Sequence, residues 1–154
     1  MLETPEIIQY AAQRTAAVHV TIPRNQIREV MGPGIGEVMS AATAQGIGPT
    51  GPWLCHHLKA DPDTFDFRIS VPVNGPVTPV GRVAEATLPA AKVARAVYQG
   101  PYEGLGAAWG ELMAWIAANG HTPGPDFWEV YLKGPETGLD ASTYRTELNR
   151  PLVG

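Results

Sequence analysis

The chain has 154 residues, a length that suits one domain with a substantial hydrophobic core and argues against a multidomain protein. Apolar residues make up 44% of the chain and charged residues 17%, which favours a folded domain over a disordered one. The 11 basic and 15 acidic side chains give a net charge of −4, so direct nucleic-acid binding is disfavoured.

Cysteine and histidine usage gives no indication of a disulfide or a metal site. The single cysteine, Cys55, excludes an intrachain disulfide, and the adjacent His56 and His57 would point to opposite faces of a strand. The N-terminus is acidic and lacks the pattern of a secretory signal, and no apolar segment approaches the length of a membrane span. We therefore expect a soluble, cytoplasmic protein without metal, cofactor or membrane association.

The first half of the chain is predicted to contain one helix between extended segments. In chain order, its elements are an extended segment at residues 7–22, a turn at 27–31, a helix at 35–42 and strands at 53–58 and 65–73. Gly32-Pro33-Gly34 predicts a break or a kink between the turn and the helix, and Gly46 is expected to end the helix.

The second half is predicted to repeat this order. Its elements are an extended segment at residues 83–98, a helix at 105–116 with an apolar stripe, a loop at 122–125 and strands at 127–132 and 143–152. Pro101 suits the first turn of that helix, and Asn119-Gly120 is expected to end it.

The two halves also share a spacing. Gly46 and Gly120 lie 74 residues apart, and so do Leu58 and Leu132. The agreement of this offset with the order of elements predicts an internal duplication. The predicted fold is therefore α+β, a single domain built from two strand-helix-strand-strand units at about residues 7–75 and 80–153.

The strand at residues 127–132 has two chemically different faces, because side chains alternate along a strand. One face carries Phe127, Glu129 and Tyr131. The other carries Trp128, Val130 and Leu132, and is predicted to be the core face.

The duplication aligns the aromatic and acidic face with a similar face in the first half. Its counterparts are Trp53, Cys55 and His57. We expect the two faces to meet about a pseudo-twofold axis, in a central cleft that suits a flat, apolar ligand.

Glu129 is the strongest charge of this predicted site. A carboxylate between aromatic rings would attract a lipophilic cation, and apolar surroundings would raise its pKa enough for general acid or base catalysis. A solvent-facing Glu129 on an outer strand is the alternative. Cys55 beside His57 is either a nucleophile or a small buried apolar group, Trp109 belongs either to the core or to the site, and Tyr102 is placed at the edge of the cleft.

Several short sequence motifs, taken together, resemble those of one family. They are Leu88-Pro89-Ala90, Tyr98-Gln99-Gly100-Pro101-Tyr102-Glu103, Gly124-Pro125, Trp128-Glu129-Val130-Tyr131-Leu132, residues 65–73 and Arg145-Thr146-Glu147-Leu148. This combination is similar to the GyrI-like small-molecule-binding domain, which includes the effector-binding domains of AraC-type and MerR-type regulators. The resemblance implies a duplicated fold of the SHS2 type around a ligand cleft.

The resemblance also implies a site and several functions. Glu129 would be the cleft carboxylate, surrounded by aromatic residues such as Tyr102, Phe127 and Tyr131. With the residues that the duplication and the helix stripe add, the expected ligand-binding residues are Trp53, Cys55, His57, Tyr102, Trp109, Phe127, Glu129 and Tyr131. The chain departs from the family at Cys55-His56-His57, where relatives often carry a tyrosine. No helix-turn-helix flanks the predicted domain, so we expect no direct transcriptional regulation.

The function that we expect is binding of aromatic or lipophilic small molecules, cations among them, for sensing or sequestration of xenobiotics or toxins. The first alternative is hydrolysis, and thereby detoxification, of cyclopropanoid DNA-alkylating natural products, with Glu129 and Tyr131 as catalytic residues. The others are inhibition of a protein such as gyrase and, from a distantly similar fold, haem binding.

Overall fold

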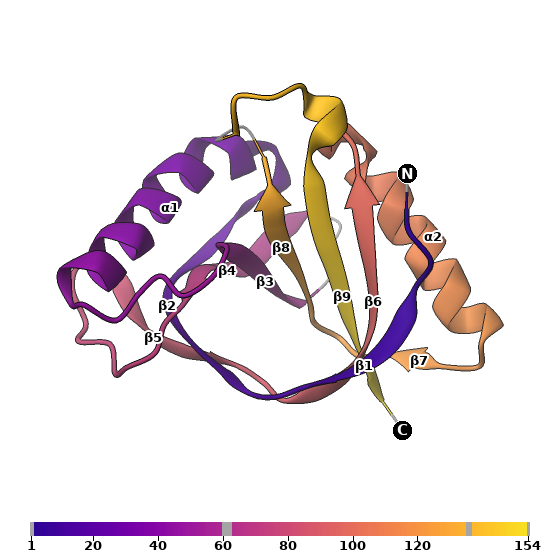
Figure 1. The fold of residues 1–154 in the computed structure, drawn as a ribbon, viewed down its shortest axis with the longest axis horizontal. Coiled ribbons are helices and arrows are strands. Elements are labelled where there is room, and N and C mark those ends of the chain that lie inside the picture. The colour runs from indigo at the N-terminus through magenta and orange to yellow at the C-terminus, as the bar shows by residue number, and fades with distance from the viewer. Residues whose placement is uncertain (1, 60–62, 135–136, 154) are drawn as a thin grey trace. The chain divides into compact units, whose positions relative to one another are not determined.

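The computed structural model describes residues 2–59, 63–134 and 137–153. The chain is α+β and divides into two compact units, one formed by residues 11–90 and the other by residues 1–10 and 91–154. Figure 1 shows the two units and labels their α-helices and strands as they are named below.

The unit of residues 11–90 consists of an antiparallel sheet and one long helix. Its elements are β2 (Gln13–Pro23), the short helix η1 (Arg24–Gln26), α1 (Ile27–Ala44), β3 (Leu54–Lys59), β4 (Thr64–Pro72) and β5 (Val83–Leu88). The strand order is β3-β4-β2-β5. Helix α1 packs on β2 and β4, and Val18, Val38 and Ile69 are fully buried in the core of this unit.

Helix α1 corrects one prediction, because it runs through Pro33 without the expected break. Proline lacks an N–H group, so the helix loses one backbone hydrogen bond there, and packing against the sheet compensates for the loss. Gly34 allows this packing to be close. A Cβ atom at Gly34 would lie only 2.3 Å from Cδ1 of Ile69 on β4.

The second unit combines an antiparallel sheet with helix α2. Its elements are β1 (Glu6–Tyr10), β6 (Ala91–Gln99), η2 (Tyr102–Gly104), α2 (Leu105–Ala118), β7 (Thr122–Pro123), β8 (Phe127–Lys133), η4 (Ala141–Thr143) and β9 (Arg145–Val153). The strand order is β1-β6-β9-β8, and the short strand β7, predicted as a loop, pairs with β9. The predicted apolar stripe of α2 is confirmed, since Ala108, Leu112 and Ile116 are buried.

The internal duplication is confirmed by equivalent positions in the two units. Helices α1 and α2 end at Ala44 and Ala118, which are 74 residues apart. The following Gly46 and Gly120 both have positive φ, at 67° and 75°, a conformation that glycine adopts without strain. The pairing register also shifts at the same place in each unit, between His57 and Lys59 in β3 and 74 residues later in β8.

The two long extended segments are each interrupted, which the sequence did not predict. Residues 7–22 divide into β1 and β2, and residues 83–98 divide into β5 and β6 at Pro89. Strand β1 pairs with β6, whereas β5 pairs with β2. The first strand of each sequence half therefore belongs to the unit built mainly from the other half, so each compact unit combines segments from both halves of the sequence.

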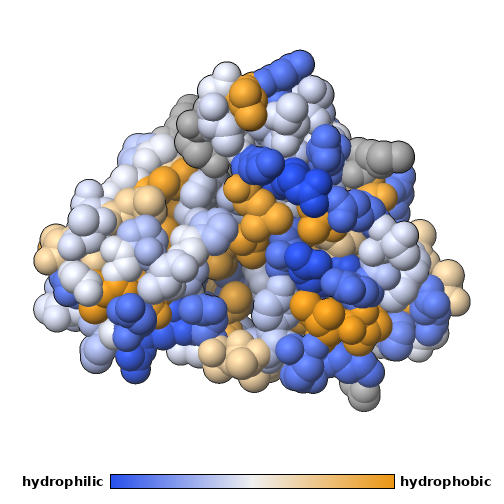
Figure 2. Space-filling model, in the orientation of Figure 1, coloured by the Kyte–Doolittle hydropathy of each residue, from blue (hydrophilic) through white to orange (hydrophobic). Residues whose placement is uncertain are grey.

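The visible surface mixes hydrophobic and hydrophilic residues, as Figure 2 shows. Large apolar side chains that are exposed include Val80, Leu139 and Val153. Among the residues that the structure describes, neither helix has the length and apolar character needed to cross a membrane.

Candidate functional site

The side chain of Glu129 lies on the face of β8 that is turned toward helix α2. In the pairing of β8 with β9, Glu129 is opposite Leu148 and Tyr131 is opposite Thr146. Residues directly opposite each other in an antiparallel pair share a face of the sheet. Leu148 is fully buried in the apolar cluster that includes Leu112 of α2, so Glu129 and Tyr131 share the helix-covered side.

This arrangement corrects the predicted core face of β8. The helix packs on the side of Glu129 and not on the side of Trp128, Val130 and Leu132. Trp128 is nevertheless buried, whereas Val130 is half-buried and Leu132 is 37% exposed. The register shift between Tyr131 and Lys133 explains the exposure of Leu132, because a bulge interrupts the regular alternation of side chains.

Glu129 is buried and accepts hydrogen bonds at both carboxylate oxygens. Tyr131 donates its hydroxyl to Oε1 at 2.6 Å, and the indole Nε1–H of Trp109 donates to Oε2, also at 2.6 Å. The residue is only 8% exposed, which excludes the alternative of a solvent-facing glutamate on an outer strand. Among the described residues, Glu129 has no basic partner.

Burial raises the pKa of Glu129 above its ordinary value, because desolvation penalises the charged form. The hydrogen bonds from Tyr131 and Trp109 act in the opposite direction but do not cancel this effect. Both donors are neutral, so a negative charge on Glu129 is solvated but not neutralised. Such a carboxylate will favour either a proton or a cation.

Trp109 reaches Glu129 because of its place on α2. It lies one turn after Leu105 and one turn before Met113, at the margin of the apolar stripe, and it packs partly against the same cluster as these two residues. Its ring also meets Phe127 edge to face, with centroids 4.8 Å apart. Trp109 therefore belongs both to the core and to the surroundings of Glu129.

A row of aromatic rings extends from the carboxylate. Tyr102, from η2, contacts Tyr131 edge to face at 6.0 Å and contacts Tyr144 at 5.2 Å. On the other side, the guanidinium of Arg150 lies 5.2 Å from the ring centroid of Phe127. Arg150 donates from Nε and Nη2 to the carbonyl oxygen of Gly124, so its guanidinium group is hydrogen-bonded to the backbone.

The structure thus brings five of the eight predicted ligand-binding residues together in one unit. They are Tyr102, Trp109, Phe127, Glu129 and Tyr131. Sequence reasoning missed Tyr144 as a neighbour of Tyr102, because it placed Tyr144 in the strand expected at residues 143–152, whereas Tyr144 lies between η4 and β9.

Trp53, Cys55 and His57 belong to the unit of residues 11–90. Trp53 is half-buried just before β3, and Cys55 and His57 are buried on that strand. The ring of His57 stacks on Phe67 at 5.2 Å, and Sγ of Cys55 lies 3.9 Å from Sδ of Met31 on α1. The cleft that these residues were expected to share with Glu129 stays a prediction.

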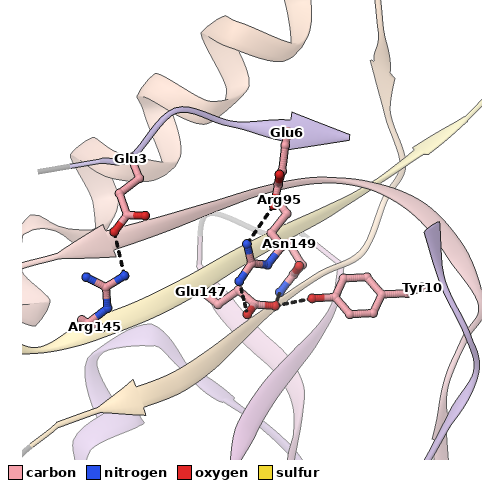
Figure 3. Close-up of polar contacts among 7 residues, drawn as sticks. All are labelled: Glu3, Glu6, Tyr10, Arg95, Arg145, Glu147 and Asn149. Atoms are coloured by element: carbon pink, nitrogen blue, oxygen red, sulfur yellow. Dashed lines mark hydrogen bonds and ion pairs between the residues drawn. The ribbon is translucent and has the colours of Figure 1, made fainter. Parts of the chain in front are cut away.

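A second buried carboxylate, Glu147, was not predicted as part of any site. It accepts hydrogen bonds from the hydroxyl of Tyr10, from Nη2 of Arg95 at 2.9 Å and from Nδ2 of Asn149 at 3.0 Å, as Figure 3 shows. Arg95 also pairs with the exposed Glu6 at 3.0 Å. In register, Glu147 lies opposite Val130, so it occupies the face of the sheet opposite to Glu129.

Glu147 differs from Glu129 in the direction in which its surroundings shift its pKa. Burial acts to raise its pKa, but the hydrogen bonds from Arg95, Tyr10 and Asn149 together lower it below the ordinary value. Burial and the bond to Glu147 raise the pKa of Tyr10, so this hydroxyl keeps its proton. Glu147 is therefore a charged, paired group on β9, and its bonds to Tyr10 and Arg95 link β9 to β1 and β6.

An open pocket of about 760 Å³ lies elsewhere in this unit. Its lining residues are Leu2, Glu3, Thr4, Gln99 and Ser142. Glu3 pairs there with Arg145 at 2.7 Å, as Figure 3 also shows. The pocket includes none of the predicted ligand-binding residues.

Solved structures with this fold include regulators and proteins called hydrolases. The crystal structure of the EcmrR C-terminal domain is 23% identical, with a TM-score of 0.83, and the match covers 97% of each chain. The match to EcmrR in its complex with DNA spans only 57% of that chain, with a TM-score of 0.81 and 23% identity.

Two further structures are more distant. SAV2435 bound to tetraphenylphosphonium is 16% identical, with a TM-score of 0.66 and coverage of 99% of this chain and 95% of that one. A hydrolase from Listeria innocua is 13% identical, with a TM-score of 0.68 and coverage of 97% and 91%. At these identities the similarity shows the fold alone.

The curated protein sequences contain no match to this chain. The model of one family, described as the GyrI-like small molecule binding domain, matches residues 3–152. Because that match spans nearly the whole sequence, and because the fold agrees, the chain belongs to the GyrI-like small-molecule-binding family.

Proposed function

We propose that this protein binds aromatic, lipophilic cations, with Glu129 as the counter-charge. The observation that carries the proposal is a buried carboxylate that accepts bonds from two neutral donors, Tyr131 and Trp109, and has no basic partner among the described residues. A buried charge without a counter-ion has an unfavourable desolvation free energy, and a bound cation would offset it.

The aromatic rings define the class of cation. Tyr102, Tyr131 and Tyr144 form a chain of ring contacts beside the carboxylate, and Tyr102 and Tyr144 are only half-buried. A cation that carries its own aromatic groups would stack on such rings, while the ring faces would attract its charge. A small inorganic cation would lose its hydration without gaining these contacts.

The comparisons support the same class of ligand. The chain belongs to a family described by small-molecule binding, and the structural neighbour SAV2435 was solved with tetraphenylphosphonium. By its chemistry, the proposed role is sensing or sequestration of lipophilic cations.

Three ligands of similar size and different charge test the proposal. Isothermal titration calorimetry should detect saturable binding of tetraphenylphosphonium, weaker binding of the neutral triphenylphosphine oxide and no binding of the anionic tetraphenylborate. Quenching of indole fluorescence should accompany cation binding and should decrease in Trp109→Phe. Equal affinity for the cation and the anion would refute a role for the charge of Glu129.

A hydrolase is the second candidate, and the raised pKa of Glu129 favours it. A carboxyl group whose pKa is raised gives and takes a proton more readily in catalysis, and can act as a general acid and then as a base. In a strained cyclopropane conjugated to a carbonyl, water would add to the ring carbon, the carbon–carbon bond would break, and the carbonyl oxygen would take up the proton. Tyr131, which donates to Glu129, would position the carboxyl group.

Mass spectrometry separates this candidate from simple binding. Incubation with a cyclopropanoid alkylator should yield a product heavier by one water, at more than one equivalent per protein, if the protein is a hydrolase. Glu129→Gln should then lose turnover. Binding of the alkylator without product would leave the protein as a binding protein.

A further inference from the structure

Thr146 occupies a central place on the helix-covered face of the sheet. On β9 it lies in register between Tyr98 of β6 and Tyr131 of β8. Its side chain is fully buried, and it shares its face with Leu148, which packs against α2. Side chains opposite each other in an antiparallel pair have Cβ atoms about 4.5–5.5 Å apart, so Thr146 adjoins the tyrosine that donates to Glu129.

The hydroxyl of Thr146 is buried and has no hydrogen-bond partner among the described residues. The two tyrosines beside it do not donate to it, because their hydroxyl groups are engaged elsewhere. Tyr131 donates to Glu129 at 2.6 Å, and Tyr98 donates to the carbonyl oxygen of Pro101 at 2.8 Å.

A hydroxyl buried in this way lowers the stability of the folded protein. Valine has nearly the same shape as threonine and would avoid the penalty. A polar group that costs stability in the core calls for a role that is not structural, and ligand recognition is one such role.

We propose that Thr146 is a polar contact of the ligand site, and that the site favours aromatic cations that also carry a hydrogen-bonding group, such as an amine, hydroxyl or carbonyl. This inference rests on the proposed function. Glu129 and Thr146 are diagonal neighbours on adjacent strands, about 7–8 Å apart at the backbone. The ligand would place its charge at the carboxylate and its polar group at the threonine hydroxyl.

The test compares two aromatic cations. Tetraphenylphosphonium has no hydrogen-bonding group, whereas ethidium carries two amino groups. Calorimetry with both cations on wild type, Thr146→Val and Thr146→Ser gives the ratio of the two affinities for each protein. This ratio is insensitive to changes of packing that affect both ligands alike.

The expected result is specific to ethidium. Thr146→Val should lower the ethidium affinity about 3–10-fold, as expected for one lost hydrogen bond, and should change the tetraphenylphosphonium affinity less than twofold. Thr146→Ser should keep the wild-type ratio. The melting temperature of Thr146→Val should equal or exceed that of wild type.

The contrary results are distinguishable. An unchanged ratio in Thr146→Val, or an equal loss for both cations, overturns the role of Thr146 and leaves the proposed function standing. A lower melting temperature for Thr146→Val would show that the hydroxyl has a structural partner, which also overturns the inference. Failure of wild type to bind either cation refutes the proposed function itself.

Discussion

Replacing Glu129 by glutamine tests whether charge, and not merely shape, recognises the ligand. Glutamine keeps the volume of the side chain and one acceptor oxygen, so it can retain the bond from Tyr131 or from Trp109. Its amide group then faces the other donor. The loss of about one hydrogen bond, roughly 1 kcal/mol, is offset by removal of a buried charge, so we expect little change in stability.

The effect on cation affinity should be much larger. With the cation centre about 6 Å from the carboxylate and an effective dielectric constant of about 20, the lost attraction is about 2–3 kcal/mol. This corresponds to a roughly 30–150-fold weaker affinity for tetraphenylphosphonium. The affinity for triphenylphosphine oxide should stay the same, because that ligand carries no net charge.

Calorimetry on wild type and Glu129→Gln measures both affinities, and Glu111→Gln is the matched control. Glu111 is exposed on α2, so its substitution makes the same change of net charge outside the site. The cation affinity of wild type should also fall as the pH is lowered through the raised pKa of Glu129, whereas Glu129→Gln should show no such dependence. Equal losses in Glu111→Gln and Glu129→Gln would refute the reasoning, since they would indicate only long-range attraction.

Other consequences follow from packing and from the second carboxylate. Gly104→Ala should lower the free energy of unfolding by about 1–3 kcal/mol in urea denaturation, because its Cβ would lie 2.0 Å from the hydroxyl of Tyr98, whereas Gly106→Ala, with open space around it, should be neutral or stabilising. Tyr10→Phe should cost about 1–2 kcal/mol in the same assay, since it removes a hydrogen bond to a charged group, and an unchanged midpoint would argue against that bond. Because the pKa of Glu147 is lowered from 4.5, its contribution to stability is complete above that value and is lost as the pH falls through the lowered pKa. Denaturation midpoints should therefore decrease in acid less steeply for Glu147→Gln than for wild type, and parallel curves would contradict this assignment.

The duplication and the helix of the second half could be predicted because their signals are local. The glycines at positions 46 and 120 and the apolar stripe of α2 are visible in short stretches of sequence. Glu129 and Tyr131 could be placed together for the same reason, since residues two apart on a strand share a face.

The orientation of β8 could not be predicted, because both of its faces are largely buried. Trp128 is 1% exposed and Glu129 is 8% exposed, so alternation alone cannot tell which face the helix covers. The continuation of helix α1 through Pro33 could not be predicted, because the packing that compensates for the lost hydrogen bond comes from a strand that is distant in sequence.

The second carboxylate was missed because its partners are remote in sequence. Tyr10 and Glu147 are 137 residues apart, and they meet only because β1 joins the unit built from the second half. The pairing of β1 with β6 and of β5 with β2 cannot be predicted from local periodicity. Each of these segments has a strand pattern that would suit either unit. Asn149 is a similar case, because a polar residue within a strand pattern is usually taken as exposed.

The most direct test of the central claim is a carboxyl carbon NMR titration of Glu129, assigned by comparison with Glu129→Gln, without and with saturating tetraphenylphosphonium. A buried carboxylate that serves as the counter-charge of a cation should titrate above its ordinary value in the free protein, and its pKa should fall when the cation is bound. An ordinary pKa in the free protein, or the same pKa with and without the cation, would contradict the account.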